Sequence, residues 1–155
     1  MKSLCALLTL GSCALGACSA PAQLDTPSGR PEVTISRTTP DNVKAAVVRK
    51  MIDKGFQVTK DAQFELAFDR PLDNKLVGAL LGSKVKGTPN GRITYSIAQV
   101  GDDVRVVADL AAITNPGSAS ERSTDINPPD AVHDVQSLLE DLRTELFVAK
   151  RPGLR

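Results

Sequence analysis

Aromatic residues are scarce in this sequence, and tryptophan is absent. Of the 155 residues, only four are Phe and one is Tyr. Proteins that hold nucleic-acid bases by stacking use aromatic side chains as the platform. The scarcity therefore argues against a stacking site for bases or sugars.

The sequence also lacks an excess of charge of one sign. Lys and Arg total 19, Asp and Glu total 18, and the formal net charge is +1. A nucleic-acid-binding domain usually shows a strong or clustered basic excess. We therefore expect no nucleic-acid partner. The share of hydrophobic residues, 41%, is that of an ordinary globular protein.

Cysteine is confined to the first 18 residues, at Cys5, Cys13 and Cys18. The chain beyond Cys18 can form no disulfide, and it offers no thiolate as a metal ligand or nucleophile. Histidine occurs once, at His133. A zinc site built from Cys and His is therefore excluded from the rest of the chain.

Only one hydrophobic run stands out, and it lies at the N-terminus. Residues 4–15, LCALLTLGSCAL, are apolar or small and follow Lys2. A membrane-spanning helix needs about 20 apolar residues. A shorter run behind a positive charge is typical of a signal peptide. We expect residues 1–17 to form one.

The end of this run resembles the lipobox of bacterial lipoproteins, with Leu15, Gly16, Ala17 and Cys18 at positions −3 to +1. The resemblance implies cleavage between Ala17 and Cys18. It also implies a diacylglyceryl thioether and an acylated amine on Cys18. Ser19 at +2 resembles the signal for outer-membrane sorting. The expected location is the periplasmic face of the outer membrane, with Cys18 holding the protein on the bilayer.

Two alternatives remain open at this end of the chain. Leu10-Gly11-Ser12-Cys13 has the same shape as the lipobox, so Cys13 is an alternative lipidation site. Cleavage there would leave an apolar run of only about eight residues, which is short for a signal peptide. The cysteines could also be small apolar leader residues that carry no lipid.

A Pro-containing segment separates the cysteines from the rest of the chain. Residues 19–31, SAPAQLDTPSGRP, contain three prolines and one glycine. This composition is typical of a linker. We expect residues 18–31 to be a lipidated cysteine with a flexible tether, which would reach roughly 40 Å when extended.

Two amphipathic helices are expected. The first lies between Thr39, a capping residue, and Gly55, which suits the position after a helix. The second spans about residues 130–148. Their apolar stripes are Val43, Val47, Val48, Met51 and Ile52, and then Val132, Val135, Leu138, Leu139, Leu142 and Leu146.

Alternating residues predict the strands. Residues 32–38 form one, and residues 56–69 form a hairpin that turns near Lys60 and points Phe64 inward. A second hairpin turns at Gly101-Asp102. That turn pairs Val100 with Asp103, Ile97 with Val106, Tyr95 with Ala108 and Ile93 with Leu110, so the apolar residues share one face.

The two stretches without clear alternation are read as connections. Residues 70–91 pack one apolar surface, form a short helix or move freely, and residues 88–91, TPNG, form a turn. Residues 114–130 form a polar loop.

The resulting order of elements is β-α-β-β-β-β-α. Two helices that each need a sheet to cover, together with hairpins, predict an α+β two-layer sandwich. Its mostly antiparallel sheet carries both helices on one face. We expect a single domain at 32–149 and a basic tail at 150–155. The order resembles the small helix-on-sheet domains of accessory envelope lipoproteins, such as the barrel-assembly lipoprotein with helix-grip domains.

The residues that could carry chemistry form no catalytic set. His133 falls on the polar face of its helix, and no G-x-S-x-G nucleophile elbow is present. Glu121, Asp125, Asp130 and Asp134 lack the spacing of a calcium loop. We therefore expect no enzyme activity, no cofactor and no bound metal.

Two surfaces could bind a partner. Lys84, Lys86 and Arg92 form a basic patch suited to anionic lipid, although a solvated loop explains them as well. On the outward face of the second hairpin, Val107, Ala111 and Ile113 form an apolar surface, unless the 70–91 connection covers it.

We expect a membrane-anchored envelope lipoprotein that acts as a non-enzymatic interaction or accessory module, with an envelope protein as its partner. That partner would meet the sheet or the 114–130 loop. The alternative is a periplasmic binder of a small apolar ligand between sheet and helices. A cavity at that place favours the ligand, and a bare apolar sheet face favours the partner.

Overall fold

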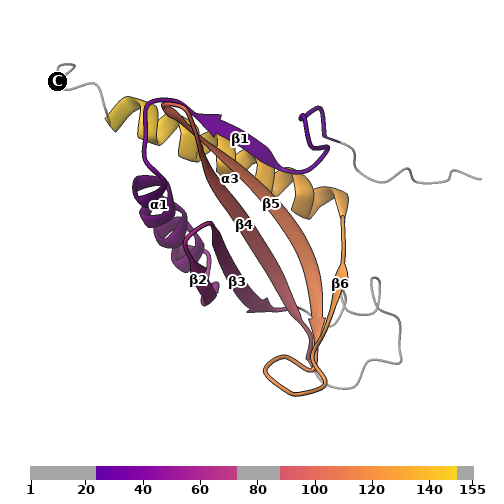
Figure 1. Ribbon diagram of the computed structural model, residues 1–155. Helices are drawn as coiled ribbons and strands as arrows, with labels where there is room; N and C mark the ends of the chain where they lie inside the picture. The colour runs from indigo at the N-terminus through magenta and orange to yellow at the C-terminus, as the bar shows by residue number, and fades with distance from the viewer. Residues whose placement is uncertain (1–23, 73–87, 150–155) are drawn as a thin grey trace, which may run out of the picture.

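The computed structural model describes residues 24–72 and 88–149. These residues form six strands and two helices (Figure 1), and the predicted α+β class is confirmed. The elements are β1 (Glu32–Ile35), α1 (Pro40–Asp53), β2 (Gln57–Ala62), β3 (Glu65–Pro71), β4 (Asn90–Val100), β5 (Asp103–Thr114), β6 (Arg122–Asp125) and α3 (Pro129–Ala149).

The strands form one antiparallel sheet in the order β1-β5-β4-β3-β2, with β6 also paired to β5. β1 and β6 share one edge of β5, because β4 occupies the other edge along its whole length. Between them, Ala108 N–H donates to the Pro31 carbonyl at 2.8 Å and Ile126 N–H donates to the Leu110 carbonyl at 3.0 Å. The edge of β5 therefore has few free backbone groups.

The long hairpin of β4 and β5 has the predicted register. Its turn is at Gly101, which has a φ of 61° that favours glycine. The pairs are Val100 with Asp103, Ile97 with Val106, Tyr95 with Ala108 and Ile93 with Leu110. A two-residue turn and one buried face leave a single acceptable register.

Helix α1 begins and ends as its sequence predicts. The Thr39 side chain accepts a hydrogen bond from the Asn42 N–H, and Gly55 after the helix has a φ of 79°. Val43, Val47 and Met51 are fully buried, but Ile52 is 55% exposed. Ile52 was wrongly assigned to the buried stripe, because it lies one position beyond Met51 and faces solvent.

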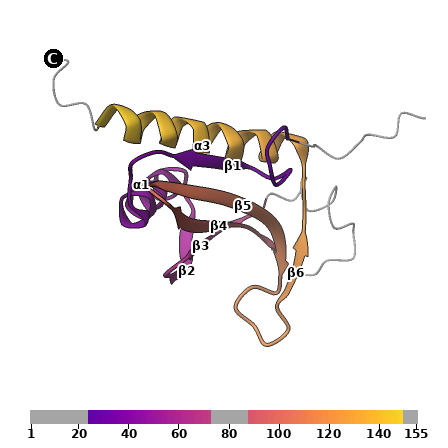
Figure 2. The same cartoon turned by 45° about the horizontal axis from the view of Figure 1, so that its top comes forward.

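Helix α3 covers the sheet on the side of β1 (Figure 2). The Gln136 side chain accepts from the Glu32 N–H at 2.8 Å and donates to the Glu32 carbonyl at 3.2 Å. One amide therefore pairs both backbone groups of Glu32, the first residue of the edge strand. This contact satisfies part of the β1 edge with a side chain.

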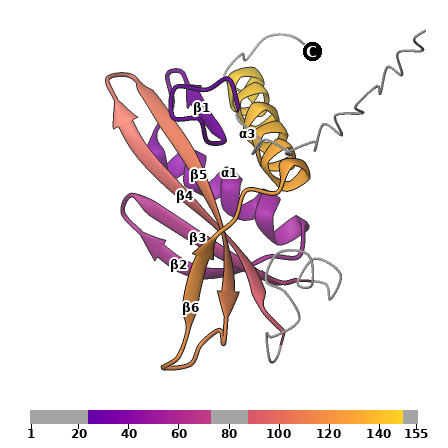
Figure 3. The ribbon, with the colours of Figure 1, turned by 90° about the vertical axis from the view of Figure 1, so that its right-hand side faces the viewer.

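Both helices lie on the same face of the sheet (Figure 3), and the core lies between the two layers. This confirms the predicted sandwich. The fully buried large side chains include Val43, Val47, Met51, Leu66, Phe68, Tyr95, Ile97, Val104, Leu139 and Leu142. The rings of Phe68 and Tyr95 meet edge to face, 5.9 Å apart.

The β2–β3 hairpin turns later than the sequence suggested. β2 continues through Ala62 and pairs it with Glu65, so the turn is at Gln63-Phe64 and not near Lys60. Phe64 was predicted to point inward but is 61% exposed, because it occupies the turn.

The segment before β1 is attached to the sheet. Thr26 Oγ1 donates to the Arg30 carbonyl at 2.6 Å, and Arg30 donates to both carboxylate oxygens of Asp109 at 2.6 and 2.9 Å. The expected tether at 18–31 therefore ends earlier than Pro31. Residues 18–23 lie outside the described residues.

The two expected connections also differ from their predictions. The polar loop at 114–130 contains β6, whose pairing with β5 uses polar residues and so left no apolar alternation to detect. Asn90 and Gly91 belong to β4, not to a turn, because they pair with Ile113 and Ala112. The possible helix at 70–91 falls mostly on 73–87, outside the described residues, as does the basic tail 150–155.

Candidate functional site

Several residues singled out in the sequence lie outside the described residues. These are Ala17, Cys18, Cys13, Lys84 and Lys86. Cleavage and lipidation at Cys18 therefore stay predictions from the sequence.

The polar residues of the 114–130 loop and of α3 do not gather into one site. His133 is exposed on α3. Glu121 accepts from the Gly117 N–H at 2.8 Å and pairs with Arg92, while Asp125 belongs to β6. Within 24–72 and 88–149, no group of three His, Cys, Asp or Glu side chains could hold a metal ion.

Arg92 lies in a polar cluster on the outer face of the sheet, away from the helices. Its guanidinium donates to Asp69 at 2.6 and 2.9 Å and to Glu121 at 3.0 Å. Thr59 and Asn90 add longer hydrogen bonds to Asp69, at 3.3 and 3.5 Å. Asp69 is only 6% exposed, so this ion pair is shielded from water.

Ion pairs continue across the rest of the outer face. Arg105 binds Glu32 at 2.7 Å, and Lys60 binds Glu65 at 3.0 Å. Val107 and Ile113, one of the two surfaces that could have bound a partner, are 7% and 0% exposed and so offer no open apolar surface. At Val107, Glu32 lies opposite in the register and carries an ion pair with Arg105. Covering by the 70–91 connection, the alternative, falls mostly outside the described residues.

These contacts lower the pKa of several carboxyl groups. Burial disfavours the charged form of Asp69, but the hydrogen bonds and charge of Arg92 outweigh it and hold its pKa below the ordinary value. A hydrogen bond from Arg105 lowers the pKa of Glu32. The Gly117 N–H and Arg92 lower that of Glu121.

The folded protein should therefore lose stability in acid. A carboxyl with a lowered folded pKa stabilises the fold above its unfolded pKa, about 4, and this contribution disappears as pH falls through the folded pKa. We expect the free energy of unfolding to be nearly constant from about pH 7 to 5 and to fall below about pH 4. Urea unfolding across this range measures it. Asp69→Asn should flatten the acid slope, and an unchanged slope would contradict the assignment.

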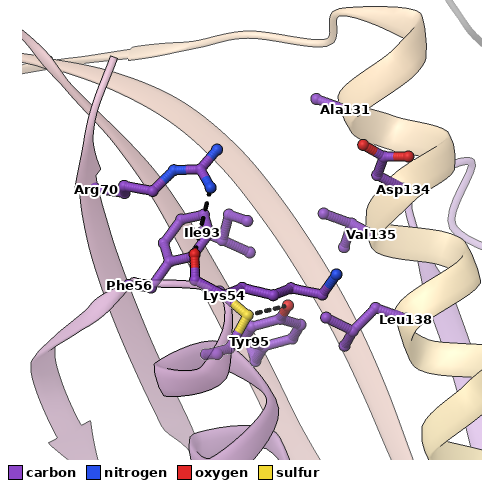
Figure 4. Close-up of a pocket in the computed structure, with 10 residues that line it drawn as sticks. Lys54, Phe56, Arg70, Ile93, Tyr95, Ala131, Asp134, Val135 and Leu138 are labelled. Carbon is purple, nitrogen blue, oxygen red and sulfur yellow. Dashed lines mark hydrogen bonds between the residues drawn. The ribbon is translucent and has the colours of Figure 1, made fainter. Parts of the chain in front are cut away.

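A groove opens on the other face, between the sheet and the helices (Figure 4). Its volume is about 260 Å³. It is lined by Met51, Lys54, Phe56, Arg70, Ile93, Tyr95, Ala131, Asp134, Val135 and Leu138. The lining comes from the C-terminal end of α1, from β3 and β4, and from the first half of α3.

A second hollow of about 100 Å³ continues the groove. The two share Phe56, Arg70, Ile93 and Ala131. The extension adds mostly apolar side chains, namely Leu72, Leu110, Ala111, Ile126 and Pro128, together with Arg92. The combined groove thus has a largely apolar wall with a few charged side chains, and Arg70 lines both of its parts.

Few polar groups reach the groove. The Arg70 guanidinium lies 4.6 Å over the Phe56 ring and donates to the Lys54 carbonyl at 3.4 Å. Across the groove, Asp134 projects from α3 (Figure 4). None of the ion pairs among the described residues includes Arg70, Lys54 or Asp134.

The groove also contains a buried hydroxyl. Tyr95 is 0% exposed, and its hydroxyl donates to the Met51 sulfur at 3.3 Å. Burial raises the pKa of Tyr95, so the phenol stays protonated. A thioether is a weak acceptor.

The sequence placed Tyr95 on the core face but did not identify the groove. Lys54, Arg70 and Asp134 come from three elements, and no local motif joins them. The one local signal was Arg70 itself, a long cation at the end of a strand whose preceding residues alternate.

Among the described residues, neither helix is long and apolar enough to cross a bilayer. No protein-family model matches the chain, and no curated protein matches it either.

Proposed function

We propose that this protein is a lipid-anchored, non-enzymatic accessory module of the bacterial envelope, and that its folded domain binds an apolar ligand. The anchor is Cys18, on the strength of the lipobox resemblance. The observation that supports ligand binding is the groove between the sheet and the helices.

The geometry favours a ligand over a protein partner on the sheet. A partner would need an exposed apolar sheet face, but ion pairs cover the outer face and Val107 is buried. A groove with apolar walls and few polar groups is instead the usual form of a small-molecule site. With a volume near 260 Å³ and a narrow extension, it suits a slender ligand such as one hydrocarbon chain.

Filling the groove should abolish binding. Ala131 lines both the groove and its extension, so Ala131→Trp would place an indole there. The test uses the full-length protein in its own membranes and a neutral alkyl probe that carries a photoreactive diazirine. We expect mass spectrometry to find cross-links on peptides that contain Ile93 and Val135, and about a tenfold loss of them in Ala131→Trp.

The matched control is Ala119→Trp, which places the same side chain on an exposed loop residue. It should label like the natural protein. Circular dichroism of all three proteins checks that each is folded. If the natural protein shows no groove cross-links, the proposed function is wrong.

A further inference from the structure

We infer that the groove accepts a single-chain fatty carboxylate, with its chain along the apolar floor and its head group at Arg70. This inference rests on the proposed function and names its ligand class. It follows from the charges at the groove and from the partners that those charges have.

The titratable side chains that line the groove carry a net positive charge. In the main part of the groove, Lys54 and Arg70 are cationic, Asp134 is anionic, and Tyr95 stays protonated. Arg92 lines the extension, but its charge is balanced by Asp69 and Glu121 and is not counted. The formal sum is +1, which matches a carboxylate with its single negative charge. A phosphate monoester, with a charge near −2 at neutral pH, would be matched less well.

Arg70 is oriented to receive an anion. Stacking on Phe56 holds its guanidinium at the groove, and its one hydrogen bond within residues 24–72 and 88–149, to the Lys54 carbonyl, is long at 3.4 Å. No Arg–carboxylate ion pair among the described residues includes Arg70. A guanidinium with free donors binds a carboxylate by two parallel hydrogen bonds.

The remaining groups suit the rest of such a ligand. In Figure 4, Ile93 lies beside Arg70, while Val135 and Leu138 project from α3 towards it, and all three would contact the chain of the ligand. Asp134 faces the groove with a charge that repels a carboxylate, so its removal should strengthen binding.

The experiment compares three photoreactive probes with the same twelve-carbon chain: a carboxylate, a neutral alcohol and a quaternary ammonium. Each is applied to the full-length protein in its own membranes, and the half-saturating concentration for groove cross-links is measured. We expect the carboxylate to label at about a fourfold lower concentration than the alcohol, because Arg70 is exposed and an ion pair in contact with water contributes less than a buried one. The ammonium probe should label least.

Substitutions at the groove test which residues produce the preference for the carboxylate probe. Arg70→Met should remove most of the preference for carboxylate, and Lys54→Met should reduce it about twofold. Asp134→Asn should increase carboxylate labelling about twofold, the opposite direction. Arg143→Met is the matched control, because Arg143 pairs with Glu140 on α3 and does not line the groove. Labelling by the neutral probe shows whether each variant keeps an intact groove.

The outcomes separate the two proposals. Equal labelling of the groove by all three probes would overturn the inference that the ligand is a fatty carboxylate, while the proposed binding of an apolar ligand would stand. A weaker carboxylate signal in Asp134→Asn would overturn it as well, because it would indicate an amine-bearing ligand. The absence of groove labelling by every probe would overturn both. If Arg70→Met also loses labelling by the neutral probe, its groove is not intact. The opposite changes expected in Lys54→Met and Asp134→Asn then test the inference, and their absence would overturn it.

Discussion

Replacing Cys18 with alanine should leave the protein as an uncleaved precursor that carries no lipid. The lipobox resemblance makes Cys18 both the residue that is acylated and the first residue after the cut. Without its sulfur neither step can follow. The effect is expected to be complete, and it is measured by incorporation of an alkynyl fatty acid and by the mass of the protein in membranes.

The second lipobox-like stretch supplies the control. Cys13→Ala removes the competing sulfur and should leave lipid incorporation and processing at the natural level. The opposite pattern, with label lost only in Cys13→Ala, would move the anchor to Cys13. Normal labelling of the double variant, with both Cys13 and Cys18 replaced by alanine, would refute a lipidated cysteine at either position.

Replacing Arg92 with methionine should lower the free energy of unfolding by about 3 kcal/mol, since removal of one partner leaves a buried charge without compensation. Asp69 would keep only the weaker hydrogen bonds of Thr59 and Asn90. Methionine retains most of the volume of the arginine stem, so the loss reports the charge. Urea unfolding of the full-length protein, followed by circular dichroism, measures the change.

Arg30→Met is the matched control for this prediction. Arg30 also pairs with an aspartate on the sheet, but the two side chains are 50% and 45% exposed. An exposed pair contributes less than about 1 kcal/mol. The double variant Asp69→Leu with Arg92→Met should recover part of the loss, because it leaves no unpaired charge. Equal small losses in Arg92→Met and Arg30→Met would show that burial of Asp69 adds nothing.

Local features of the sequence predicted most of the fold. The cap at Thr39, the glycine at 55 and the turn at Gly101 each depend on residues within a few positions of one another. Alternation fixed which side of β4 and β5 faces the helices. The same reasoning failed at Phe64 and at β6, because a turn and a polar strand carry no apolar pattern.

The polar cluster around Asp69 shows the limit of reading one strand at a time. Phe68 faces the core, so alternation along β3 places the next residue, Asp69, on the outer face. Its burial depends on Arg92, which reaches it across the β3–β4 pairing. An outward charge becomes a buried ion pair only when the neighbouring strand supplies a long cation.

By itself, the sequence determined the lipobox-like segment, the helix ends, the register of the long hairpin and the two-layer class. All of these depend on neighbouring residues or on simple periodicity. Only the tertiary structure decided which surface is open. The groove needs the end of α1, the strands β3 and β4 and the start of α3 in one place. Lys54 and Asp134, which are far apart in the sequence, line the same groove because both helices cover one face of the sheet and leave a groove between that face and themselves.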